Sequence, residues 1–170
     1  LKGKFTRNYT NLNANWSNEL IFRYGVNKQD GQDMKKTDDA LQINSTFGYR
    51  HNPKSNWFHS AKFNFSTQFT NGYAYPNTTR AISKPFAPAY IFLGMGAENI
   101  NKEKNRTVYI SPFTFKTTLV LDQTLANQGA VGVPKAIYDE DKNLITEGKK
   151  ARTEFGFLIT NKYKKEVVKN

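Results

Sequence analysis

The segment WFHSAKFNFSTQF, residues 57–69, alternates between two kinds of side chain. Its odd positions are mainly aromatic and its even positions are mainly polar. Successive side chains of a β-strand point to opposite faces of a sheet, so this segment predicts a strand with one apolar face and one polar face. A run of roughly a dozen residues is also long, since strands usually have about five or six. Such a strand fits a membrane-spanning β-barrel, in which about nine to eleven tilted residues cross the bilayer.

The same alternation recurs along the chain, and polar loops separate the alternating segments. We predict strands over residues 13–27, 39–50, 57–69, 89–98, 107–121 and 152–164. Pro112 lies inside one of these segments and predicts a bulge or an edge position there. Residues 1–12 and 165–170 are weaker candidates for further strand. In the loop 122–150, two short apolar pairs flank an acidic turn and predict a protruding hairpin.

These segments define the expected fold class. We predict an all-β protein, an antiparallel up-and-down transmembrane β-barrel, with residues 1–170 forming a single barrel domain. About six or seven strands are too few to close a membrane barrel, for which eight is the minimum. We therefore interpret the chain as part of a larger barrel, from a longer protein. The loops support this fold, because long and short loops alternate along the chain, as they do where long loops extend outside the cell and short turns face the periplasm.

The two faces of the predicted strands give two sets of residues. With the long loops outside, several Trp and Tyr residues fall near the ends of the apolar face, where aromatic side chains border a membrane. We expect this face to contact lipid through Trp16, Tyr24, Tyr49, Trp57, Phe63, Phe65, Phe69, Tyr109, Phe113, Phe115, Phe155, Phe157 and Tyr163. We expect the polar face to line the barrel interior with Glu19, Arg23, Asn44, Lys62, Asn64, Gln68, Lys116 and Glu154. The loop residues Tyr73, Tyr75 and Tyr138 would be exposed contact points.

Composition excludes several classes of protein. The chain has no Cys, so a disulfide framework or a thiolate metal site is impossible. Aromatic residues make up 14% of the chain, too many for a disordered segment. The net charge of +11 would suit nucleic acid or an anionic surface, but the cations are scattered and no nucleic-acid-binding motif is present. Solvated loops and barrel rims explain them better than nucleic acid does.

No catalytic constellation emerges from the sequence. His51 and His59 have no nucleophile elbow or zinc motif beside them. Asp139-Glu140-Asp141 could bind a hard cation, although it lacks the pattern of a calcium loop and an acidic turn is the better interpretation. Asn-x-Ser/Thr triplets occur six times, and in three of them the strand pattern explains the spacing, since residues two apart share a face. We expect no catalytic residue, no metal site and no cofactor.

Several short motifs carry a resemblance to a known family. They are Lys36-Thr37-Asp38-Asp39-Ala40-Leu41, residues 67–73 (TQFTNGY), residues 82–90 (ISKPFAPAY), Ser111-Pro112-Phe113 and residues 125–133 (LANQGAVGV). In this order they resemble a domain-of-unknown-function family of outer-membrane β-barrels from the Bacteroidota, over about residues 15–157. The family implies the barrel fold and the outer-membrane location, and it has no settled activity to carry over.

These observations lead to one function and one alternative. We expect a non-enzymatic outer-membrane β-barrel that acts as a scaffold, a transporter or a subunit of an envelope complex, with outer-membrane lipid and other envelope proteins as partners and no nucleic acid. The alternative is a soluble secreted β-sandwich that binds glycan or protein, in which the aromatic face is an ordinary core.

Overall fold

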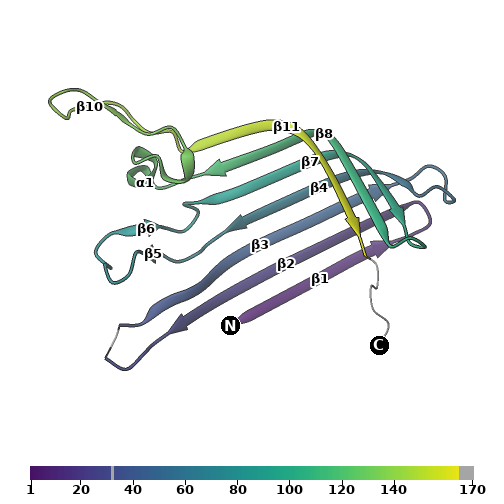
Figure 1. Ribbon diagram of the computed structural model, residues 1–170, viewed down its shortest axis with the longest axis horizontal. Helices are drawn as coiled ribbons and strands as arrows, with labels where there is room; N and C mark the ends of the chain where they lie inside the picture. Colours follow the sequence, from purple (N-terminus) through teal and green to yellow (C-terminus); the bar gives the residue numbers. More distant parts are fainter. Residues whose placement is uncertain (32, 165–170) are drawn as a thin grey trace.

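The computed structural model describes residues 1–31 and 33–164, which are built around one large antiparallel sheet (Figure 1). The strands of this sheet lie side by side in the order in which they occur along the chain, so the chain meanders across the sheet. Seven strands take part: β1 (Lys2–Thr10), β2 (Ala14–Asn27), β3 (Lys35–Tyr49), β4 (Trp57–Thr67), β7 (Ala89–Asn101), β8 (Arg106–Leu119) and β11 (Ala151–Tyr163). The all-β fold and the up-and-down strand order are confirmed. Within the described residues the sheet is open, with β1 and β11 as its edges.

All six predicted strands form, and their ends differ by a few residues. Strand β3 begins at Lys35 rather than at residue 39, because its first residues pair with the end of β2 across a bulge at Gly25 and Val26. Strand β7 continues to Asn101, since it stays paired with β8 up to the turn. The weak candidate at the start of the chain forms β1, which pairs with β2 along its whole length. Residues 165–170 lie outside the described part.

A bulge interrupts β8 at Ser111-Pro112-Phe113, as Pro112 predicts. The register on both sides of β8 shifts here, against β7 between Met95 and Ala97 and against β11 between Gly156 and Leu158. Strand β8 is therefore internal, and the alternative of an edge position is wrong. The buried Ser111 hydroxyl lies 3.0 Å from the carbonyl oxygens of Met95 and Phe113, within hydrogen-bonding distance of both. An extra residue in one strand reverses the faces of the residues that follow it relative to the neighbouring strands.

The connections differ sharply between the two ends of the sheet (Figure 1). One end has the turns at residues 11–13, 50–56 and 102–105, and we call it the turn end. The other end has the connections 28–34, 68–88 and 120–150, and we call it the loop end. The two longest of these connections hold their own elements: the hairpin β5 (Gly72–Tyr73) with β6 (Ala81–Ser83), helix α1 (Gln123–Asn127), the 3-10 helix η1 (Ala130–Gly132), and the hairpin β9 (Ile137–Tyr138) with β10 (Leu144–Thr146).

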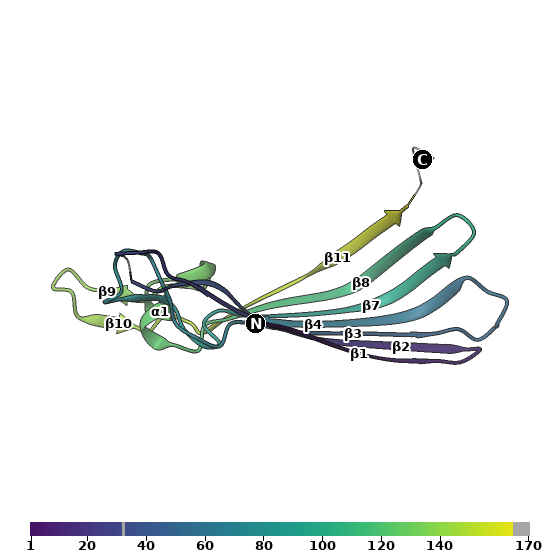
Figure 2. The same ribbon diagram turned by 90° about the horizontal axis from the view of Figure 1, so that it is seen from below.

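The buried apolar cluster of the described residues is small and lies at the loop end. It contains Ala87, Val120, Leu125, Ala126 and Val133. The large sheet itself is twisted and curved, as the view along its edge shows (Figure 2). No helix among the described residues is long and apolar enough to cross a membrane.

Candidate functional site

Apolar side chains form continuous rows across one face of the sheet, which we call the apolar face. One row pairs Tyr9 with Trp16, Trp16 with Phe47, Phe47 with Ala61, Ala61 with Met95 and Met95 with Phe113. A second row runs from Phe5 through Leu20, Ile43 and Phe65 to Ile91. Because these residues come from successive strands, the alternation along each strand becomes a surface only through the observed register.

This apolar face is largely exposed. Phe113, Phe155 and Phe157 are 55%, 64% and 61% exposed, and Trp16 and Trp57 are about half exposed. Hydrogen bonds link three polar side chains of this face: the Trp16 indole donates to Ser45 Oγ at 2.9 Å, and the Ser45 hydroxyl donates to Asn18 Oδ1 at 2.8 Å. Asn18 therefore interrupts the apolar pattern while its side-chain oxygen is hydrogen-bonded. By register, Arg7 and His59 also lie on this face.

Aromatic residues also mark both borders of the apolar face. Trp16, Tyr49, Trp57 and Tyr163 lie near the turn end. Near the loop end, the Phe69 ring stacks on Phe22 with centroids 4.8 Å apart and also contacts Tyr24 at 5.7 Å. The register and ring contacts place twelve of the predicted residues on this face: Trp16, Tyr24, Tyr49, Trp57, Phe63, Phe65, Phe69, Phe113, Phe115, Phe155, Phe157 and Tyr163.

Tyr109 is the exception, and its predicted position on the apolar face is wrong. The bulge at Ser111-Pro112-Phe113 changes the phase of β8, so Tyr109 lies opposite Glu98 on the other face. There it is 1% exposed, and the Lys62 ammonium lies 4.1 Å from the centre of its ring. Gly94 gives the phenol room, because a Cβ at that position would lie 2.6 Å from Tyr109 Oη.

The other face, which we call the polar face, carries ion pairs and amide contacts between neighbouring strands. Glu19 pairs with Lys4 of β1 and accepts a hydrogen bond from Asn44 of β3 at 3.1 Å, and Asn64 of β4 donates to Asn44 in turn. Four consecutive strands are therefore joined by one chain of polar side chains. These linked side chains run across the sheet from β1 to β4.

A second polar group lies between β4, β7 and β8. Lys62 Nζ lies 2.6 Å from Glu98 Oε1, and the Glu98 side chain is almost fully buried. Near the loop end of the same face, Arg23 Nε lies 3.2 Å from a carboxylate oxygen of Asp38. Sequence analysis missed Glu98 as a member of the polar face, although it lies two residues after Gly96 and so shares the face of the glycines.

The remaining predicted interior residues make weaker contacts. Gln68 lies just beyond β4 and donates to the Lys84 carbonyl at 3.2 Å. Lys116 and Glu154 lie directly opposite each other on β8 and β11. Glu154 lies 3.4 Å from Arg152 Nη2. By register, Lys116 and Glu154 share the polar face near the loop end of the sheet.

Asp39 ties the end of β3 to the loop after β4. Its carboxylate accepts hydrogen bonds from the Phe69 and Thr70 amides, each at 3.0 Å, and from the Thr70 hydroxyl. Lys36 Nζ lies 2.8 Å from the same carboxylate and also donates to the Thr70 carbonyl at 3.2 Å. The Asp39 carboxylate is thus a buried anchor, and the sequence does not reveal this role, because the backbone amides that it binds lie about thirty residues away.

The longest loop is fixed at its start by an ion pair and a helix cap. Asp122 caps helix α1 by accepting from the Leu125 amide at 3.0 Å, and it pairs with Lys84 Nζ at 2.6 Å. The Lys84 ammonium and the capping amides hold the pKa of Asp122 below its usual range. Arg152 donates to the Gly132 carbonyl at 3.1 Å, which fastens the 3-10 helix to the start of β11.

The loop tyrosines behave differently from one another. Tyr138 is 51% exposed in the hairpin β9–β10, as predicted. Tyr73 and Tyr75 are half-buried and contact each other, with ring centroids 6.4 Å apart, and Tyr75 Oη accepts from the Lys36 amide at 3.0 Å. The prediction that both are exposed is wrong, because the two rings contact each other and Tyr75 also meets the backbone of Lys36.

The acidic turn in this hairpin is held by Asp139. Its carboxylate accepts from the Asn143 amide at 2.7 Å and from the Asn143 side chain at 3.0 Å, which lowers the pKa of Asp139. Among residues 1–31 and 33–164, no group of three or more His, Cys, Asp or Glu side chains could hold a metal ion. The acidic turn is thereby explained by its own hydrogen bonds.

Comparison with known proteins finds a family match over the first part of the chain. Residues 1–73 match the family described as Protein of unknown function (DUF3078). This confirms the predicted resemblance to a domain-of-unknown-function family. The matched part spans β1 to β5, including Asp39 and its partners Phe69 and Thr70. No curated protein and no solved structure matches the chain significantly.

Proposed function

We propose that the large sheet is part of the wall of an outer-membrane β-barrel, with its apolar face against lipid and its polar face toward the barrel interior. The observation that carries this proposal is the inverted burial of the two faces. Burying one large apolar side chain is worth about 1.5–3 kcal/mol, so a whole face of exposed aromatic residues is unfavourable in water. In a bilayer the same residues contact hydrocarbon and need no protein layer over them.

The dimensions of the strands support the same proposal. The seven strands of the sheet have 9 to 15 residues, the length needed to cross a bilayer at the usual tilt. The aromatic residues at the two borders of the apolar face correspond to the girdles found at membrane interfaces. In this proposal the loop end faces outside the cell and the turn end faces the periplasm, because outer-membrane barrels have long outer loops and short inner turns.

The open edges of the sheet need partners in this setting. Unpaired backbone N–H and C=O groups are costly in hydrocarbon, so a membrane sheet must close on itself. We infer that strands beyond these seven complete the wall. The polar face, with side chains linked from strand to strand, would then surround a hydrogen-bonded interior, and the protein would act as a non-enzymatic scaffold, transporter or subunit of an envelope complex.

The chain contains its own reporters for this proposal, because both of its Trp residues, Trp16 and Trp57, lie on the apolar face near the turn end. We would refold the protein, with the strands that complete its wall, in vesicles of phosphatidylcholine whose acyl chains are brominated at different depths, and measure the fluorescence of Trp16 and Trp57. Shallow bromines should quench strongly, deep bromines weakly, and aqueous iodide little. Strong quenching by iodide with none by bromolipid would overturn the proposal.

Solubility offers an independent measurement. A membrane wall should need detergent or lipid to stay dispersed, since its apolar face remains uncovered without them. A chain that is folded and monomeric in plain buffer would instead favour a soluble secreted protein, the alternative given by the sequence.

A further inference from the structure

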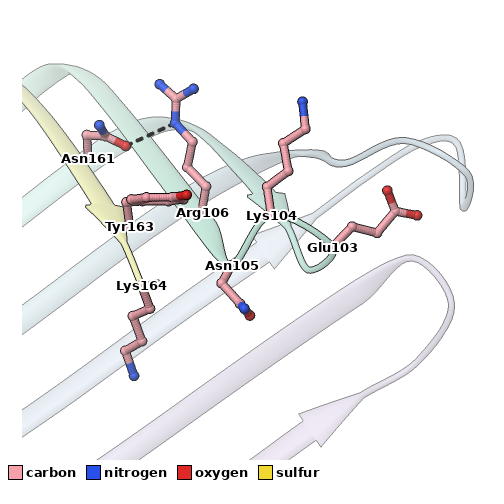
Figure 3. Close-up of a pocket in the computed structure, with 7 residues that line it drawn as sticks. All are labelled: Glu103, Lys104, Asn105, Arg106, Asn161, Tyr163 and Lys164. Carbon is pink, nitrogen blue, oxygen red and sulfur yellow. Dashed lines mark hydrogen bonds between the residues drawn. The ribbon is translucent and has the colours of Figure 1, made fainter. Parts of the chain in front are cut away.

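A cationic groove lies at the turn end, directly beyond the apolar face. It is lined by Glu103, Lys104, Asn105, Arg106, Asn161, Tyr163 and Lys164, from the β7–β8 turn and the end of β11 (Figure 3). Arg106 and Tyr163 are register partners, and Asn161 and Tyr163 continue the row of Phe155, Phe157 and Ile159 along β11. The groove therefore begins where the exposed aromatic residues end.

Hydrogen bonds fix the backbone of the segment that carries the basic residues of the groove. The Lys104 amide donates to Asn101 Oδ1 at 2.9 Å, and Asn105 adopts the left-handed conformation with φ of 47°, which Asn tolerates better than most residues. The Lys164 amide then donates to the Asn105 carbonyl at 3.1 Å and ties the turn to the edge strand. The positions of Lys104 and Arg106 are thus set by the fold.

The side chains of the groove leave positive charge available. Arg106 Nε donates to Asn161 Oδ1 at 3.1 Å, which orients the guanidinium while its two terminal nitrogens stay outward (Figure 3). Among residues 1–31 and 33–164, no carboxylate lies within ion-pair distance of Lys104, Arg106 or Lys164. Glu103 is the acidic member of the lining and extends away from Arg106 (Figure 3).

This combination suits a phosphate group. A guanidinium binds phosphate oxygens with two parallel N–H bonds, and an ammonium adds a point charge. Tyr163 is 59% exposed beside them, and Tyr is the residue that sits at the level of lipid headgroups. A free phosphate ion would make the same polar contacts, but the continuity of the groove with Ile159, Phe157 and Phe155 also provides a surface for acyl chains.

We propose that this groove binds the phosphate of an anionic phospholipid, with Arg106 and Lys104 as the phosphate contacts and Tyr163 beside the glycerol region. This inference rests on the proposed membrane location and adds a preferred lipid to it. Because the turn end faces the periplasm in that proposal, the lipid would belong to the inner leaflet of the outer membrane. Lys164 also lines the groove, but its side chain points away from Arg106 and Lys104 (Figure 3).

The test uses the protein together with the strands that complete its wall, refolded in phosphatidylcholine vesicles, with phosphatidylglycerol as the probe. Brominated phosphatidylglycerol or brominated phosphatidylcholine is titrated in, and the quenching of Trp fluorescence by the two lipids is compared. The number of bound lipid molecules is counted separately by native mass spectrometry. We expect wild type to prefer phosphatidylglycerol and K104Q/R106Q to lose about five-fold in preference for each cation removed. The control K28Q/K149Q removes the same charge at the loop end and should keep the wild-type preference.

Different results distinguish failure of the phosphate site from failure of the membrane proposal. If K104Q/R106Q inserts normally and keeps the wild-type lipid preference, the phosphate site is overturned and the membrane proposal stands. If the wild type with its wall completed inserts into neither lipid, both are overturned. R106K guards against misfolding, since it should insert and retain most of the preference. Displacement of phosphatidylglycerol by millimolar inorganic phosphate would identify a free-phosphate site and overturn the lipid.

Discussion

The polar and apolar faces of the large sheet differ in how far their side chains are withdrawn from solvent. On the polar face Glu98 is 7% exposed and Tyr109 is 1% exposed, while on the apolar face Phe155 is 64% exposed. On the polar face long side chains span neighbouring strands and cover one another, as Lys62 does with Glu98 and the ring of Tyr109. A protein built for water places these two kinds of surface the other way round. The two faces should therefore respond differently to the same kind of substitution.

A charge on the apolar face should have the largest effect. Phe65 is the β4 member of the second apolar row, which crosses the sheet. Phe65→Arg should cost about 2–4 kcal/mol of folding free energy in lipid if this position faces the middle of the bilayer. Ser66→Arg introduces the same charge one residue away on the polar face and should cost clearly less. Denaturant titrations in vesicles measure both, and equal losses would contradict the assignment of faces.

Breaking the ion pair between Lys62 and Glu98 should have the second largest effect on stability. Lys62→Ala leaves the almost fully buried Glu98 carboxylate without its ammonium partner, which should cost about 2–3 kcal/mol. Lys62→Ala combined with Glu98→Gln should recover part of this loss, because the unpaired charge is gone. A double-mutant cycle measures the coupling, and strictly additive losses would show that the two groups do not stabilise each other.

Two glycines of the polar face should respond differently to the same substitution. A Cβ at Gly96 would lie 1.9 Å from the Ile110 carbonyl oxygen, so Gly96→Ala must move backbone at the bulge and should cost about 1–3 kcal/mol. Gly156 of β11 has no atom within 4 Å of such a Cβ, so Gly156→Ala should be near neutral or slightly stabilising. Thermal unfolding of both variants tests the close approach of β7 and β8.

The smallest effect concerns the loop end and its dependence on pH. The pKa of Asp122 is lowered in the folded state, so its contribution is present above the pKa of about 3.9 of a free Asp and is lost as pH falls through the lower, folded value. Asp122→Ala should cost about 1 kcal/mol at neutral pH by removing the cap of α1 and the partner of Lys84.

Hydrogen exchange of the α1 amides measures this contribution. Protection in wild type should decrease as the solution is acidified, whereas Asp122→Ala should have low protection at every pH. Glu140→Gln, in the exposed turn between β9 and β10, serves as the control. It should change neither the protection of the α1 amides nor its dependence on pH. An α1 segment equally protected in wild type and in Asp122→Ala would contradict the role of Asp122.

The sequence predicts those parts of the fold that depend on local alternation. Strands β2, β4 and β8 are recognisable because their apolar residues recur at every second position. Pro112 predicts the bulge of β8. The effect of the bulge is not local, because the face on which Tyr109 lies depends on how β7 and β11 pair around Ser111. Strand β1 is hard to find for another reason, since its apolar side chains are few and its stability comes from pairing with β2.

The loop end is predicted least well, because its contacts join distant residues. Asp39, Lys84 and Asp122 are ordinary charged residues in the sequence, and their roles as anchors arise where β3 and the connections 68–88 and 120–150 meet at the loop end of the sheet. The short elements α1, β5 and β6 are held by these contacts and carry little periodicity of their own. The motifs that suggested the family fall largely in these connections, which is why they gave the resemblance without giving the structure.

The number of strands in the meander has a consequence for how the wall can close. Direction reverses at every turn, so in a sheet of seven strands the first and the last, β1 and β11, point the same way. Joining those two edges directly would create a parallel seam in an otherwise antiparallel cylinder. A seamless antiparallel cylinder needs an odd number of additional strands between them, and cross-linking of cysteines introduced along β1 and β11 would identify the neighbours that each edge acquires.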